Sequence, residues 1–123
     1  MLVGYARVST ADQNLHRQID ALVKAGVDKR NIYQEKITGT KRNRPELDRM
    51  IAELQQGDTV IISELTRLSR STQDLFEITQ LIESKGANIK SLKESWLDTT
   101  TSHGRLLFTI FAGISQFERD LIA

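Results

Sequence analysis

The chain has 123 residues, a length that fits one domain large enough to bury a core. With 39% hydrophobic residues, 27% charged residues and a single Pro, its composition is that of a globular protein, not a disordered or fibrous one. It has no Cys, which excludes disulfides, zinc fingers and thiol chemistry, and its net charge of +1 lacks the basic excess of a nonspecific nucleic-acid binder. That total conceals an asymmetry, since residues 1–50 carry ten Lys and Arg against six Asp and Glu, whereas residues 51–123 carry seven against ten.

The predicted elements alternate between strands and helices. In chain order they are a strand over 2–8, a helix over 11–25, a strand over 31–35, a basic loop over 36–44, a helix from Pro45 to Gly57, a strand over 59–63, a loop or single turn over 64–71, a helix over 72–85 and a weak strand over 88–92. This order predicts an α/β fold with a mainly parallel central sheet flanked by helices. Ligands of such sheets bind beyond the carboxyl ends of the strands.

A long apolar helix is predicted over residues 104–123. One stripe holds most of its apolar side chains, with three others off the stripe; the stripe is Leu107, Ile110, Phe111, Ile114, Phe117 and Leu121, and the others are Leu106, Phe108 and Ile122. A helix that is apolar on more than one face is either deeply buried or part of an oligomer interface. Because no stop signal follows, we expect the sequence to be a fragment cut inside this helix.

Arg7 and Ser9 are two residues apart near the end of the first predicted strand, so their side chains point the same way if the strand stays extended. A serine hydroxyl beside guanidinium groups is suited to attack a phosphate ester, because arginines bind phosphate oxygens and stabilise the charge of the transition state. The alternative is that Ser9 is only an N-cap, with Asp12 three residues further on.

Further arginines could join such a phosphate site. Arg67 and Arg70 are three apart and would share one face of a helical turn, and Arg44 follows the basic loop. The alternative for each of them is an ordinary solvated charge. On pattern alone, Gln18 is expected to be a surface residue of the first helix. The carboxylates show no metal-ligand spacing and no phosphate-binding glycine motif is present, so we expect no metal and no nucleotide cofactor.

Three segments, YARVSTADQNLHRQ, LTRLSRS and FERD, together resemble the serine recombinases, specifically the small resolvase and invertase branch. The first is similar to that family's signature around its nucleophilic serine, the second to its arginine-bearing motif, and the third to a Glu-Arg pair in its long interface helix. The resemblance extends from Met1 to Ala123 with the motifs in the same order. It implies a catalytic domain over residues 1–103 and the start of the interface helix over 104–123, with the helix-turn-helix DNA-binding domain absent from this chain.

The resemblance also implies a reaction. Ser9 would attack a phosphodiester of double-stranded DNA, form a 5′-phosphoserine linkage and release a 3′-hydroxyl, without a metal or other cofactor. Phosphate-binding and supporting roles would fall to Arg7, Arg44, Arg67 and Arg70, and to Gln13, Gln18, Glu118 and Arg119. The partners would be a DNA crossover site and further copies of the chain, as a homodimer and a synaptic homotetramer, in the bacterial cytoplasm and not at a membrane.

Thr66 departs from the commonest pattern of the family, in which an Asp precedes the first arginine of this motif, so the general acid stays unassigned. Two other functions are open: a catalytically inactive DNA-organising or accessory protein with the same fold, and an unrelated α/β enzyme that acts on small phosphate esters. The retained Ser9 with all four arginines argues against the first, and the long two-faced terminal helix argues against the second.

Overall fold

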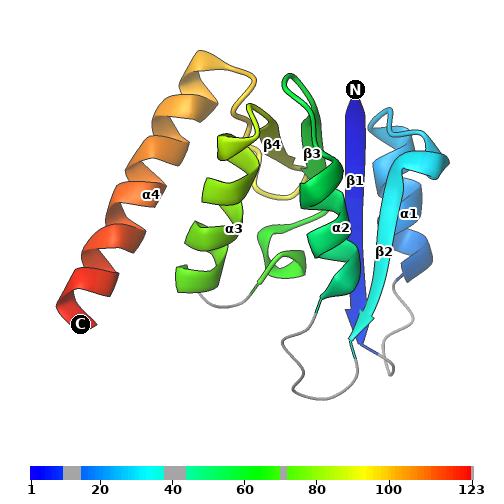
Figure 1. The fold of residues 1–123 in the computed structure, drawn as a ribbon. Coiled ribbons are helices and arrows are strands. Elements are labelled where there is room, and N and C mark those ends of the chain that lie inside the picture. Colours follow the sequence, from blue (N-terminus) through cyan, green and yellow to red (C-terminus); the bar gives the residue numbers. More distant parts are fainter. Residues whose placement is uncertain (10–14, 38–43, 70–71, 123) are drawn as a thin grey trace.

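The computed structural model describes residues 1–9, 15–37, 44–69 and 72–122 (Figure 1). The described elements are strands β1 (Leu2–Ser9), β2 (Ile32–Ile37), β3 (Thr59–Ile62) and β4 (Asn88–Ser91), helices α1 (Leu15–Lys24), α2 (Pro45–Glu53), α3 (Thr72–Ser84) and α4 (Ser102–Ile122), and the 3₁₀ turns η1 (Lys29–Asn31) and η2 (Leu65–Arg67). No helix among these residues is both long and apolar enough to cross a membrane.

The four strands form one parallel sheet in the order β2-β1-β3-β4. The predicted α/β fold with a parallel central sheet is therefore confirmed. β1 lies inside the sheet and pairs with β2 along Gly4 to Ser9 but with β3 only along Leu2 to Tyr5. The last residues of β1 therefore extend beyond the end of its pairing with β3, at the carboxyl edge where ligands of parallel sheets bind.

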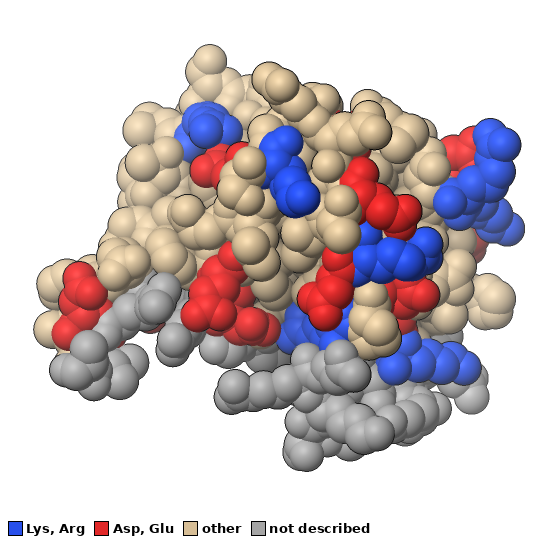
Figure 2. Space-filling view, viewed as in Figure 1, with Lys and Arg blue, Asp and Glu red and all other residues tan. Residues whose placement is uncertain are grey.

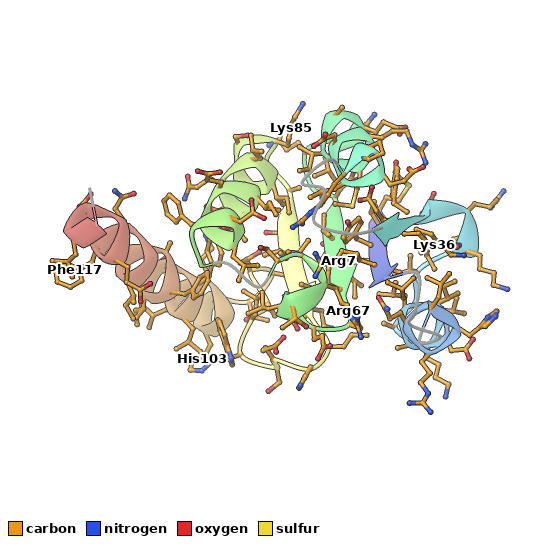
Figure 3. The ribbon with its side chains drawn as sticks, turned by 90° about the horizontal axis from the view of Figure 1, so that it is seen from below. Arg7, Lys36, Arg67, Lys85, His103 and Phe117 are labelled. Atoms are coloured by element: carbon orange, nitrogen blue, oxygen red, sulfur yellow. The ribbon has the colours of Figure 1, made fainter. Side chains whose placement is uncertain are left out.

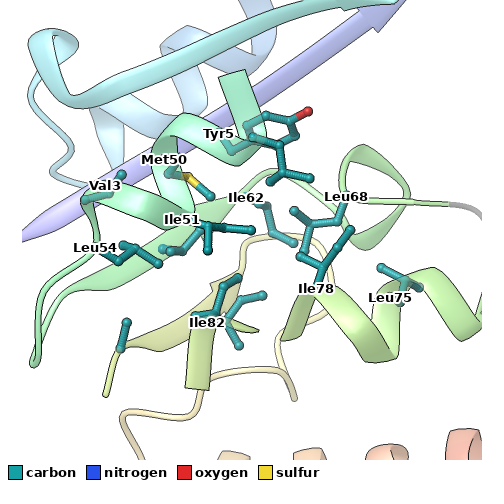
Figure 4. Packing of buried hydrophobic residues seen from close by; sticks show 14 of the residues in the cluster. Val3, Tyr5, Met50, Ile51, Leu54, Ile62, Leu68, Leu75, Ile78 and Ile82 are labelled. Carbon is teal, nitrogen blue, oxygen red and sulfur yellow. The ribbon is translucent and has the colours of Figure 1, made fainter. Parts of the chain in front are cut away.

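Helices cover both faces of the sheet. Alternate residues of β1 point to opposite faces, so Val3 and Tyr5 join the larger core beneath α2 and α3 (Figure 4). Ala6 joins a smaller cluster beneath α1. Full burial of an aliphatic side chain in such a core stabilises the fold by roughly 1.5–3 kcal/mol. Two layers of apolar packing thus hold the carboxyl edge of the sheet in place.

The structure confirms two of the predicted helix signals, but the predicted end of the second helix at Gly57 is wrong: α2 ends at Glu53, because Leu54 adopts an extended conformation. Pro45 is the first residue of α2, and Gly26, which follows α1, has a φ of +104° that favours glycine. β2 runs to Ile37 and so extends two residues into the predicted basic loop, whose residues 38–43 lie outside the described part of the chain.

The structure shows which apolar side chains of α4 face the domain. Phe108, predicted to lie off the main stripe, is buried and packs near Phe111, whose ring also lies 6.1 Å from that of Trp96. Most of the predicted stripe is exposed instead, because α4 packs mainly on α3 and presents its Gly104 and Phe108 side to the domain. One apolar face is therefore docked and another faces solvent, in a row formed by Leu106, Ile110, Ile114, Phe117 and Leu121.

Candidate active site

The candidate site lies at the carboxyl edge of the sheet, where β1 ends beside the turn η2. Figure 3, which views the molecule from this edge, shows Arg7 of β1 and Arg67 of η2 close together. Their contacts cross between the two elements: the Arg7 guanidinium donates to the Thr66 carbonyl, and Arg67 Nη1 donates to the Arg7 carbonyl over 3.3 Å. Two residues 60 positions apart in the sequence are thereby fixed side by side, as the phosphate-site prediction requires.

Gln18 holds the backbone of Arg7 from the side of α1. Its Oε1 accepts from the Arg7 N–H over 3.0 Å, and its Nε2 donates to the Arg7 carbonyl over 3.0 Å. The expectation of a surface position for Gln18 is wrong, since the residue is only 4% exposed. The physical reason is that β1 pairs with β3 only as far as Tyr5. The backbone N–H and carbonyl of Arg7 lie beyond that pairing, and the Gln18 side-chain amide provides their hydrogen bonds instead.

Arg44 reaches η2 from the start of α2. Its Nη1 donates to the Leu68 carbonyl, and its Nη2 pairs with Asp74 Oδ2 at 3.1 Å. Its side chain is 14% exposed, so the alternative of a freely solvated loop charge is wrong. Asp74, on α3, is a partner that the sequence did not indicate, because nothing in its spacing connects it with Arg44.

A buried pair beneath Arg44 was also not predicted. The Tyr5 hydroxyl donates to Glu35 Oε2 over 2.6 Å, and the same carboxylate accepts from the N–H groups of Glu46 and Leu47 in the first turn of α2, over 3.1 and 3.3 Å. Burial, reinforced by the Glu35 carboxylate, raises the pKa of Tyr5 far above its usual value. The sequence did carry a signal, because period-2 alternation places Glu35 on the same face of its strand as Tyr33.

Some predicted site residues are not brought together. Glu118 is exposed on α4 next to Phe117, which Figure 3 places at the far end of the molecule from Arg7. Gln13, Arg70 and the side chains of Ser9 and Arg119 lie outside the part of the chain that the structure describes. The backbone of Ser9 is the last residue of β1, opposite Ile37 of β2, so the nucleophile predicted from the sequence belongs to the same strand end as Arg7.

The charge on the molecular surface is mixed. On the face shown in Figure 2, Lys and Arg side chains are interspersed with Asp and Glu. No cluster of three or more His, Asp or Glu residues suited to a metal ion occurs within the described ranges. Around η2, the described residues that carry positive charge include Arg7, Arg44 and Arg67.

Comparison with known proteins gives a consistent set of relatives. The profile of the family described as "Resolvase, N terminal domain" matches residues 2–123. The chain is 63% identical to a resolvase of Clostridium perfringens over its whole length and 49% identical to the transposon Tn917 resolvase of Enterococcus faecalis over 99% of it, while it spans 66% and 65% of those proteins. The crystal structure of the N-terminal catalytic domain of TP901-1 integrase superimposes with a TM-score of 0.76 at 33% identity, covering 98% of this chain and 97% of that one. By the family profile and these identities, the chain belongs to the resolvase family, of which it carries the N-terminal domain.

Proposed function

We propose that the chain is the catalytic domain of a site-specific DNA recombinase that cuts and rejoins DNA through Ser9. The observation that carries the proposal is the meeting of Arg7, Arg44 and Arg67 at one short turn, η2, beside the strand that ends at Ser9. The names of the relatives support the proposal, since they are called resolvases or, for TP901-1, an integrase.

The proposed reaction is a transesterification. The Ser9 hydroxyl oxygen attacks the phosphorus of a DNA phosphodiester, the bond from phosphorus to the 3′ oxygen breaks, and a 5′-phosphoserine linkage forms. The proton lost by Ser9 ends, in the net balance, on the released 3′-hydroxyl. The arginines lower the barrier because they stabilise the negative charge that builds on the phosphate oxygens in the transition state. Rejoining is the same displacement run backwards by a 3′-hydroxyl.

We also propose that α4 joins copies of the chain, first as a dimer and, on DNA, as a synaptic tetramer. Its exposed row of large apolar side chains, from Leu106 to Leu121, recurs every three or four residues and therefore forms one continuous stripe. Glu118 lies within this stretch of α4, so its proposed supporting role would be exerted at the interface between copies and not within its own domain.

The test of cleavage uses a chimera in which this chain replaces the matching part of the Clostridium perfringens resolvase. Duplexes that bind the chimera are selected from a random-sequence library and then nicked, so that a short strand is lost after cleavage and rejoining is prevented. The proposal expects a denaturant-stable protein–DNA adduct that Ser9→Ala abolishes. Arg67→Ala should slow its formation by about 10²–10³-fold, the usual effect of removing one charge-stabilising donor.

The matched control is Arg17→Ala, which removes an exposed arginine of α1 and should leave the rate unchanged. An adduct that persists in Ser9→Ala would refute the assignment of the nucleophile. DNA binding by the wild-type chimera without any adduct would instead favour the alternative of a DNA-organising protein.

A further inference from the structure

The turn η2 and the residue that follows it contact three arginines of the candidate site. Its Thr66 carbonyl accepts from Arg7, the Leu68 carbonyl just after it accepts from Arg44, and Arg67 is its last residue. The turn's own hydrogen bonds are local, from the Arg67 N–H to the Glu64 carbonyl at 3.0 Å and from the Leu68 N–H to the Leu65 carbonyl at 2.9 Å. Local bonds fix the shape of a turn but not its orientation, so the orientation depends on contacts with other elements.

The segment that follows β4 supplies such contacts. Its backbone stays hydrogen-bonded to the end of β3 and the residue after it, because the N–H groups of Leu92 and Lys93 donate to the carbonyls of Ile62 and Ser63, both over 2.9 Å. This pairing brings Glu94 alongside the first residue of η2. The segment is thus held to the end of β3 by backbone hydrogen bonds.

Glu94 makes the direct link to the turn. Its Oε1 accepts from the Leu65 N–H over 2.9 Å and from the Ser91 hydroxyl over 2.5 Å, while its own N–H donates to that hydroxyl oxygen over 3.2 Å. Leu65 is the first residue of η2, so its N–H has no acceptor within the turn. Glu94 therefore anchors the start of η2 to the end of β4.

A second link runs in parallel at the surface. Lys93 Nζ lies 3.1 Å from Glu64 Oε2, and Glu64 Oε1 lies 3.4 Å from Arg67 Nε. This chain of charges is more exposed than the Glu94 contact, since the Lys93 side chain is 69% exposed, and exposed ion pairs contribute little. The half-buried Glu94 is the stronger anchor of the two.

We propose that Glu94 is a positioning residue for the phosphate site: it holds η2, and through η2 it sets where Arg7, Arg44 and Arg67 present their charge. The inference rests on the proposed function. Glu94 acts through the backbone of the turn and is not assigned a contact with DNA. Loss of its carboxylate leaves the Leu65 N–H without its acceptor and lets the turn shift.

The activity test compares Glu94→Ala, Glu94→Gln and a control, Ser95→Ala, in the chimera. Ser95 is the exposed neighbour of Glu94 in the same segment. Glu94→Ala should slow adduct formation at saturating DNA by about 10²-fold, since displacement of catalytic groups by about 1 Å has that effect. The dissociation constant for DNA should change by less than about twofold, because the affinity arises mainly from phosphate contacts elsewhere.

Glu94→Gln should recover most of the rate, because the Gln Oε1 can still accept from the Leu65 N–H and the Ser91 hydroxyl. The inference is overturned if Glu94→Ala cleaves at the wild-type rate, if its loss of rate is matched by Ser95→Ala, or if Glu94→Gln is as slow as Glu94→Ala.

A second measurement on the 123-residue chain separates positioning from unfolding. Hydrogen exchange of the Leu65 amide, followed by NMR, should speed up at least tenfold in Glu94→Ala while the amides of Val60 and Ile62 stay protected. Loss of protection throughout β3 would overturn the inference in favour of a general structural role. If the wild-type chimera forms no adduct, the proposed function is refuted. The hydrogen-exchange rate of the Leu65 amide in the 123-residue chain still tests, independently of cleavage, whether Glu94 holds the turn.

Discussion

The two tyrosines of the chain offer a matched test of how the Tyr5–Glu35 pair supports the site. Each donates its hydroxyl to a glutamate: Tyr5 to Glu35 over 2.6 Å in the core, and Tyr33 to Glu53 over 3.1 Å at the surface. Tyr→Phe keeps the ring and removes only the hydroxyl. The same chemical change therefore probes a buried carboxylate at one position and an exposed carboxylate at the other.

The expected loss of stability follows from the burial of the acceptor. Glu35 is 3% exposed, so without the Tyr5 hydroxyl its carboxylate keeps, among the described residues, the two N–H donors of α2 and cannot recruit bulk water. A hydrogen bond to a charged group contributes about 1.5–3 kcal/mol, and we expect Tyr5→Phe to lower the free energy of unfolding by that amount. Tyr33→Phe should lower it by less than about 0.5 kcal/mol, because water replaces the lost donor.

The pH dependence provides a second signature. The pKa of Tyr5 is raised in the folded protein, so above its unfolded value of about 10 only the unfolded chain releases the proton. This contribution to stability is complete below pH 10 and decreases as the pH rises beyond it. At pH 11 the free energy of unfolding of the wild type should be about 1.4 kcal/mol lower than below pH 10, whereas that of Tyr5→Phe should not fall for this reason. The difference in stability between the two proteins therefore becomes smaller at high pH.

The free energy of unfolding of the wild type, Tyr5→Phe and Tyr33→Phe is measured by urea unfolding, followed by the fluorescence of Trp96, the single tryptophan. The tryptophan packs against Phe111 of α4 and against the larger core, so its signal reports unfolding of the whole domain. Equal stabilities of Tyr5→Phe and Tyr33→Phe, or a high-pH loss that survives in Tyr5→Phe, would refute this account of the buried pair.

Three further predictions concern other parts of the domain. Gln18→Ala should lower the free energy of unfolding in urea by about 1–3 kcal/mol, because the Arg7 N–H loses its acceptor and the Arg7 carbonyl loses one of its two donors; an unchanged stability would contradict the role of Gln18 in holding the end of β1. Phe117→Ser should weaken self-association by about 1–4 kcal/mol in sedimentation equilibrium, while the stability of the monomer stays within about 0.5 kcal/mol, since this ring is exposed in the single chain. The pKa of Glu64 is lowered, chiefly by its hydrogen bond with Lys93, so the stability it contributes is present above pH 4.5 and is lost as the pH falls through the lowered pKa. An acid titration of unfolding should show this loss in the wild type but not in Glu64→Gln.

Local patterns were sufficient for the order of the elements. Pro45 at a helix start, Gly26 after a helix end and the apolar run 59–62 act through backbone sterics and burial that depend on near neighbours, and the structure agrees with each. The end of β2 was misjudged by two residues, because pairing with β1 carries the strand into a polar segment.

The candidate site was predicted in part. Motif resemblance named Arg7, Arg44 and Arg67, and the structure brings these three to one turn. The catalytic and phosphate-binding roles of these arginines, of Ser9 and of Arg70 stay predictions, and the structure does not describe the side chain of Ser9 or any part of Arg70.

What the sequence determined by itself is the class of fold and the kind of chemistry, because hydrophobic periodicity, glycine and proline signals and residue types are properties of the chain read locally. Only the tertiary structure decided which groups meet. Gln18 is buried because β1 extends beyond its pairing with β3, and Glu94 accepts from the Leu65 N–H because the segment after β4 is hydrogen-bonded to the end of β3. It likewise decided that Phe108, and not the main apolar stripe, is the docked side of α4. Such contacts join residues far apart in sequence, and their partners are selected by the packing of whole elements and not by any neighbouring residue.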